Sequence, residues 1–137
     1  MTAKTLFTGT AHVSAGPEGR ARTSDGRFDF ALPEPHPAAE QLFAAAWSAC
    51  YLGAIGFVAQ QRKLALPAQP EVETTVKLSL GETGFQLSGR LDVTLKGLDR
   101  DVALELIDAA HAVCPYSKAV HGNIEVETNL VEVEAFA

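Results

Sequence analysis

The alternation of apolar and polar side chains predicts three short strands at the start of the chain, at residues 5–13, 20–23 and 27–32. Glycine-containing segments at residues 15–19 and 25–26 separate these strands and predict turns. Two longer alternating stretches, residues 71–80 and 85–95, flank a Gly-Glu-Thr-Gly sequence and predict a β-hairpin. Alternation over residues 123–133 predicts a closing strand.

Two segments have helical character. Residues 38–63 follow Pro37 and are apolar on every side, so this helix must be covered on every side. Asp99 is a candidate N-cap for a second helix, which Pro115 should end at Cys114. The apolar face of that helix is expected to carry Val102, Leu106, Ala110 and Val113. The order βββ-α-ββ-α-β predicts an α+β domain with mainly antiparallel strands.

The first helix has an unusual stripe of small residues. One sheet covers only one side of a helix, and the small residues at helical spacing invite close approach of another helix: Ala45, Ala49, Gly53 and Gly56. We therefore expect a symmetric homodimer that shares these helices. In the alternative, the second helix provides all the cover within a monomer. Residues 42–59 are uncharged and just reach membrane-spanning length, but a buried core helix is expected because the flanking chain has ordinary soluble-domain character.

Composition limits the classes of partner. The 137 residues are enough for one domain, residues 1–137, and 47% of them are apolar. The net charge is -6 and no basic stripe is present, which argues against binding to nucleic acid or to anionic membranes. The N-terminal residues lack the apolar run of a signal peptide, so a cytoplasmic location is expected. A purely structural disulfide is rare in that compartment.

The chemistry centres on two cysteines, Cys50 and Cys114, which fit neither a CxxC motif nor a zinc ribbon. From composition alone, both could be inert core residues. If they are active, Cys50 lies in mid-helix and needs a nearby cation to become a thiolate. Cys114 lies at a helix C-terminus, where the backbone dipole disfavours an anion. Cys50 is therefore the better nucleophile and Cys114 the better resolving partner.

Candidate cations and metal ligands are few. Arg20 and Arg22 lie on one face of a predicted strand, and either could instead be an ordinary solvated arginine. His111, Cys114 and His121 form a loose H-x2-C-x6-H pattern, a weak alternative that would use the second cysteine as a metal ligand.

Two segments carry a family resemblance. Residues 40–54, starting Glu-Gln-Leu-Phe and including Cys50, and residues 109–124, including Cys114-Pro-Tyr-Ser, resemble the organic hydroperoxide resistance proteins. These form the Ohr branch of the OsmC-like family. Ser24-Asp-Gly26 and residues 96–100 extend the resemblance over nearly the whole chain.

The resemblance implies an intertwined α+β homodimer of OsmC-like fold, with two active sites at the subunit interface. It also implies a thiol peroxidase for alkyl and lipid-derived hydroperoxides. By position, Cys50 is the peroxidatic thiol, Cys114 the resolving thiol, and Glu40 the carboxylate that orients an arginine. No bound metal or flavin is implied, and the reductant is a dihydrolipoyl dithiol, either dihydrolipoamide or a lipoylated protein.

The chain departs from the family pattern in two places. Pro17 stands where the family usually has its first turn arginine, and Arg20 matches the second, so Arg20 or Arg22 must replace it. Arg20 is expected to be the cation that activates Cys50, because it borders the turn. The loop at residues 32–37 is also shorter than the Gly-rich loop of the family.

The positions of two site residues on the first helix predict a shared site. Glu40 and Cys50 are ten residues apart, roughly 15 Å along a helix axis, so Glu40 is expected to serve the active site of the other subunit. The apolar surroundings are expected to favour an alkyl peroxide over hydrogen peroxide, and consist of Phe43, Trp47, Tyr51 and Tyr116.

Two other functions remain open. A hot-dog-like acyl-thioester hydrolase would also wrap a sheet around a long central helix, but would need neither cysteine. A redox sensor or small-molecule binder would use the cysteine pair without turnover.

Overall fold

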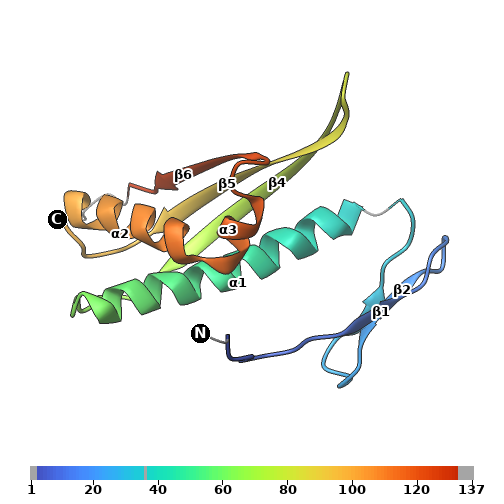
Figure 1. The fold of residues 1–137 in the computed structure, drawn as a ribbon, viewed down its shortest axis with the longest axis horizontal. Helices are drawn as coiled ribbons and strands as arrows, with labels where there is room; N and C mark the ends of the chain where they lie inside the picture. Colours follow the sequence, from blue (N-terminus) through green and yellow to red (C-terminus); the bar gives the residue numbers. More distant parts are fainter. Residues whose placement is uncertain (1–2, 36, 133–137) are drawn as a thin grey trace. The chain divides into compact units, whose positions relative to one another are not determined.

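The computed structural model describes residues 3–35 and 37–132, and the chain falls into two compact units, Met1–Ala39 and Glu40–Ala137 (Figure 1). The first contains an antiparallel sheet in the order β1 (Ala11–Val13), β2 (Arg20–Thr23) and β3 (Asp29–Ala31). The strand predicted at residues 5–13 was too long, and so was that at residues 27–32. The central strand β2 has only four residues, and each neighbouring strand pairs with it at three positions.

The turn between β2 and β3 forms as predicted. The carboxylate of Asp25 accepts hydrogen bonds from the Thr23 hydroxyl at 2.7 Å and from the backbone N–H of Arg27 at 2.9 Å. These bonds lower the pKa of Asp25, with the backbone donor contributing most. Gly26 follows with φ of +73°, a conformation that glycine adopts without steric cost.

The second unit is built on a sheet in the order β4 (Glu71–Gly81), β5 (Gly84–Thr94) and β6 (Glu125–Leu130). The predicted hairpin is confirmed: β4 and β5 are antiparallel and the Gly81–Gly84 pair closes their register. The closing strand is shorter than predicted and runs parallel to β5. It does so because two helices separate β5 from β6 in sequence, and such a crossover returns the chain in the same direction.

Three helices complete this unit: α1 (Pro37–Gln61), α2 (Arg100–Val113) and α3 (Pro115–Val120). The sequence prediction missed α3, so the order is βββ-α-ββ-α-α-β. Asp99 is the N-cap of α2, but its side chain forms no capping hydrogen bond. The buried stripe of α2 is also shifted from the predicted one, and consists of Ala103, Leu106, Ile107 and Ala110.

The core lies between the helices and one face of the β4–β5–β6 sheet (Figure 1). The largest fully buried side chains come from α1, β5 and α2: Trp47, Tyr51, Ile55, Leu91, Val93, Leu106 and Ile107. Alternate residues of β4 and β5 face away from the helices and are exposed and polar, for example Glu73 and Arg90. By length and composition α1 could cross a membrane, but here one side of it packs into this core.

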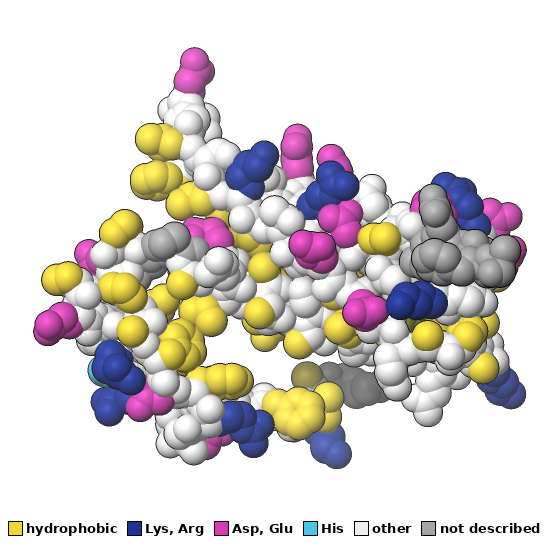
Figure 2. Space-filling model, turned by 180° about the vertical axis from the view of Figure 1, so that it is seen from behind, with side chains coloured by type: hydrophobic (Ala, Val, Ile, Leu, Met, Phe, Trp, Pro, Cys, Tyr) yellow, Lys and Arg dark blue, Asp and Glu magenta, His cyan; other side chains and the backbone are white. Residues whose placement is uncertain are grey.

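Two apolar surfaces of the second unit remain uncovered. The predicted small-residue stripe of α1 is exposed, and so is Phe57 beside it, at 52%. The tip of the β4–β5 hairpin, which projects at the upper left of Figure 2, carries Leu78, Leu80 and Phe85, all at least half exposed. The second unit by itself therefore does not cover α1 on every side.

Candidate functional site

The two cysteines, which the sequence places on separate elements, meet in the second unit. The Cys114 thiol lies 3.4 Å from the Cys50 thiol, sulfur to sulfur, and both are free. Cys50 is in the middle of α1 and half-buried, whereas Cys114 is fully buried. A disulfide has an S–S distance of about 2.05 Å, so a small movement would join the two sulfurs.

Local backbone chemistry fixes the conformation of Cys114 between α2 and α3. Pro115 disfavours helical backbone at the residue before it, and Cys114 accordingly adopts φ −60° and ψ 120°. Cys114 is therefore both the C-cap of α2 and the N-cap of α3. Its backbone still links the two helices, because its N–H donates to Ala110 and its carbonyl accepts from Lys118.

The surroundings of Cys50 raise the pKa of its thiol. Burial is the main cause, and the neighbouring Cys114 thiol acts in the same direction. A hydrogen bond from the backbone N–H of Tyr116 opposes this shift, because it stabilises the thiolate. Because the net shift is upward, a nearby positive charge would favour the thiolate, and the requirement for a cation stays a prediction.

Two hydrogen bonds from α1 involve residues that flank the cysteines in sequence. The indole N–H of Trp47 donates to the hydroxyl of Ser117 at 2.9 Å, and the Tyr51 hydroxyl donates to the carbonyl of Ile107 at 2.9 Å. Sequence reasoning missed Ser117, because a lone serine in a six-residue helix carries no pattern that marks it as buried.

The four apolar residues expected around the site differ in burial. Trp47 and Tyr51 are 0% exposed and are core residues. Tyr116 is exposed and Phe43 is half-buried, so these two are the ones that a substrate could reach. The Phe43 ring packs on Trp47, with 5.6 Å between centroids.

Glu40 lies in the first turn of α1, where the helix dipole favours a carboxylate. The helix is continuous from there to Cys50, so the axial separation of about 15 Å holds for two residues of the same copy. The structure thus does not bring Glu40 to Cys50 along α1, and its role in the other subunit stays a prediction.

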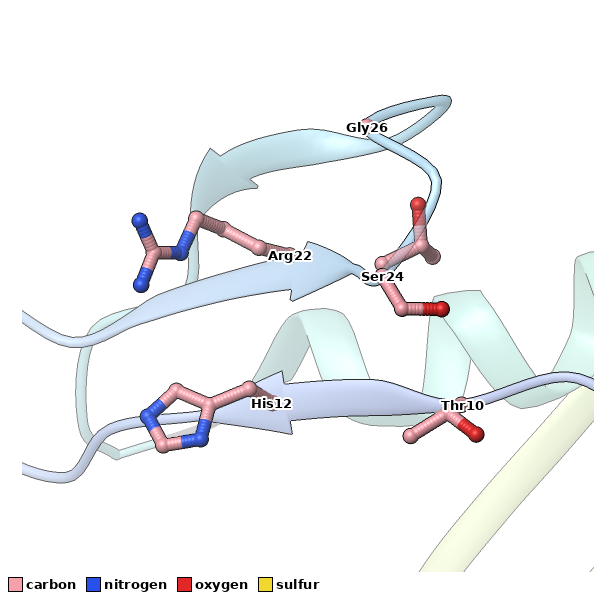
Figure 3. Close-up of a pocket in the computed structure, with 6 residues that line it drawn as sticks. Thr10, His12, Arg22, Ser24 and Gly26 are labelled. Carbon is pink, nitrogen blue, oxygen red and sulfur yellow. The ribbon is translucent and has the colours of Figure 1, made fainter.

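Arg20 and Arg22 belong to the first unit and lie on the exposed face of β2, opposite the buried Ala21. The Arg20 guanidinium pairs with Asp29 across the sheet, with Nη2 2.6 Å from Oδ1. Arg22 instead lines a hollow of about 420 Å³, where it extends beside His12 (Figure 3). Which arginine acts on Cys50 stays a prediction.

The weak metal alternative finds no support. Within residues 3–35 and 37–132, no three His, Cys, Asp or Glu side chains are grouped so that they could hold a metal ion. The pKa of His111 is lowered, mainly by burial and also by His121, while Asp108 acts in the opposite direction.

Comparison with known proteins places this chain in a family. The model of the OsmC-like protein family matches residues 32–129. The organic hydroperoxide resistance protein of Xanthomonas axonopodis pv. citri is 38% identical over 136 residues, covering 93% of this chain and 96% of the relative. The chain belongs to the organic hydroperoxide resistance branch of the OsmC-like family. The resemblance seen in the sequence is confirmed.

Solved structures of the organic hydroperoxide resistance proteins share the fold. OhrB of Bacillus subtilis matches with a TM-score of 0.83 and 39% identity, covering 93% of this chain and all of that structure. The protein from Elizabethkingia anophelis, crystallised with thiocyanate bound, matches with a TM-score of 0.87 and 32% identity, covering 96% of this chain and all of that structure. The predicted OsmC-like α+β fold is therefore confirmed.

Proposed function

We propose that this protein is a thiol peroxidase that reduces organic hydroperoxides to alcohols. The observation that carries the proposal is the 3.4 Å approach of the half-buried Cys50 thiol to the buried Cys114 thiol. Relatives named for organic hydroperoxide resistance support the substrate class.

In the proposed cycle, the Cys50 thiolate attacks one peroxide oxygen and the O–O bond breaks. The sulfur is oxidised to sulfenic acid, and the departing alkoxide takes a proton and leaves as an alcohol. The Cys114 sulfur, after loss of its proton, attacks the Cys50 sulfur, forms the disulfide and releases water. A dihydrolipoyl dithiol, free or on a lipoylated protein, then reduces the disulfide by two electrons and becomes the cyclic disulfide. No bound cofactor or metal takes part.

Arg20 is proposed as the cation that lowers the pKa of Cys50, with Arg22 as the alternative. A guanidinium would stabilise the thiolate and the leaving alkoxide through its planar set of donors. The exposed ion pair with Asp29 must then be exchanged for a new one, at small cost because such pairs contribute little stability. Thiolate absorbance as a function of pH tests this: Arg20→Ala should raise the pKa of Cys50, whereas the matched control Arg22→Ala should not. The reverse result would assign the role to Arg22.

The active protein is proposed to be a cytoplasmic homodimer. A second copy would cover the exposed stripe of α1 and the apolar hairpin tip, and would bring its Glu40 to the site from across the interface. Mixed dimers of Cys50→Ser and Glu40→Ala chains test this. If Glu40 acts across the interface, one of the two sites regains both groups and activity exceeds that of either mutant homodimer. If it acts within its own chain, mixing restores nothing.

The central experiment is steady-state peroxide reduction with dihydrolipoamide. We expect turnover with tert-butyl and fatty-acid hydroperoxides that exceeds turnover with hydrogen peroxide. Cys50→Ser should abolish it, because a serine hydroxyl is not appreciably ionised at neutral pH. Cys114→Ser should permit one attack and no cycle. Consumption of a single equivalent of peroxide by the unmodified protein, with dithiol present, would instead indicate a redox sensor.

A further inference from the structure

Cys114, the proposed resolving cysteine, directly precedes the short helix α3, which few buried contacts hold in place. Helix α3 has six residues, and Ser117 is the one among them that is fully buried, at 2% exposed. Its hydroxyl accepts the indole N–H of Trp47, a residue far away in sequence on the helix that carries Cys50. This bond joins α3 to α1 three residues beyond Cys114 and three residues before Cys50.

Trp47 is itself a rigid partner. It is fully buried, its ring packs on Phe43, and its outer edge lies over Gly89 of β5. A β-carbon at position 89 would lie 2.7 Å from Cζ3 of the indole, so glycine leaves the space that the ring occupies. The position of the indole N–H is therefore fixed by the sheet, and α3 is held against a rigid donor.

A second hydrogen bond joins α1 to α2. The hydroxyl of Tyr51, the residue after Cys50, donates to the carbonyl of Ile107 in the middle of α2. Four buried apolar residues hold α2 in the core, whereas α3 has no fully buried apolar residue. Loss of the Trp47–Ser117 bond should therefore loosen α3 and the turn at Cys114 more than it loosens the rest of the fold.

We propose that Trp47 and Ser117 are positioning residues for the resolving step, and that their hydrogen bond sets how fast the disulfide closes. This inference rests on the proposed function. The Cys50 sulfenic acid has two fates: Cys114 attacks it, giving the disulfide and water, or a second hydroperoxide oxidises it to sulfinic acid and is reduced to an alcohol. Holding Cys114 close favours the first fate, as proximity does for any intramolecular attack.

The test measures both fates in Ser117→Ala, Trp47→Phe and the double variant. Each reduced protein is mixed with increasing tert-butyl hydroperoxide, and intact mass gives the fractions of disulfide and sulfinic acid. We expect Ser117→Ala to reach half over-oxidation at a peroxide concentration about tenfold lower than wild type, equivalent to ~1.4 kcal/mol in the closing step. The rate of sulfenic acid formation, measured in a Cys114→Ser background, should be unchanged. A generally destabilised protein would not show this selectivity.

Ser48→Ala is the matched control. Ser48 lies one residue from Trp47 on α1, and its hydroxyl bonds to Thr74 of β4 at 2.6 Å, away from α3. Its over-oxidation threshold should stay within about twofold of wild type. The double variant should be no more sensitive than the more sensitive single variant, because both substitutions remove the same bond.

The outcomes separate the two proposals. If wild type forms the disulfide with hydroperoxide but Ser117→Ala and Trp47→Phe keep its threshold, the positioning role is wrong and the peroxidase proposal stands. Equal sensitivity of Ser48→Ala and Ser117→Ala would also overturn the role, because the effect would then be general. If wild type forms no disulfide with hydroperoxide, the proposed function fails and this inference fails with it.

Discussion

Gly89→Ala is expected to destabilise the protein, because the new methyl group would overlap a side chain that cannot withdraw. Its carbon would lie 2.7 Å and 2.8 Å from Cζ3 and Cη2 of Trp47, whereas carbon atoms in contact are about 3.5–4.0 Å apart. Trp47 is fully buried and held by Ser117. Overpacking of this kind costs roughly 1–3 kcal/mol. For a chain of this size, the loss corresponds to a decrease in Tm of roughly 3–15 °C.

The assay is thermal and urea unfolding of the reduced protein, followed by circular dichroism. Gly81→Ala is the control at the end of β4, because a β-carbon there meets nothing within 4 Å, and its unfolding free energy should stay within about 0.5 kcal/mol of wild type. In a Trp47→Phe background, the cost of Gly89→Ala should shrink, since the smaller ring leaves room for the methyl group. A Gly89→Ala protein as stable as wild type would refute the steric reasoning.

Three further predictions concern stability. Ile55→Ala should lower the unfolding free energy by about 2–5 kcal/mol in urea titrations, because the side chain is fully buried in the core. Asp29→Asn should change it by less than about 1 kcal/mol, because the ion pair with Arg20 is half exposed on both sides. Burial lowers the pKa of His111 below its usual 6.5, so the folded state prefers the neutral ring. The contribution of the neutral ring to the free energy of unfolding is present above pH 6.5 and is lost as the pH falls through the lowered pKa. The unfolding free energy of His111→Gln should therefore change less between pH 7 and pH 5 than that of wild type.

Local patterns predicted the parts of the fold that local chemistry determines. The Gly-Glu-Thr-Gly turn defines the hairpin register from either side, and the strand bounds predicted there differ from the observed ones by one residue at most. Pro115 fixes the backbone of Cys114 and therefore the end of α2. The proposed roles of the two cysteines rest on the different electrostatics of mid-helix and helix-end positions, and these positions follow from the sequence.

What the sequence did not reveal depends on tertiary contacts. Helix α3 is only six residues long, too short for a hydrophobic period, and Ser117 is buried by its contact with Trp47 from far along the chain. The direction of β6 depends on the path of α2 and α3 across the sheet. The sequence also did not reveal that Trp47 and Tyr51 are fully buried, because an apolar helix gives no sign of which side faces the core.

The uniform apolarity of α1 is compatible with two different surfaces on one helix. Tyr51 points into the core and is fully buried, whereas Ala49 is exposed. Cys50 lies between them in sequence and is half-buried, at the boundary of the two surfaces. A thiol in the core would meet Cys114 but not a substrate, and a thiol on the small-residue stripe would meet solvent but not Cys114. Only the boundary position lets one sulfur be reached both from outside and by Cys114, which is what the proposed peroxidase cycle requires.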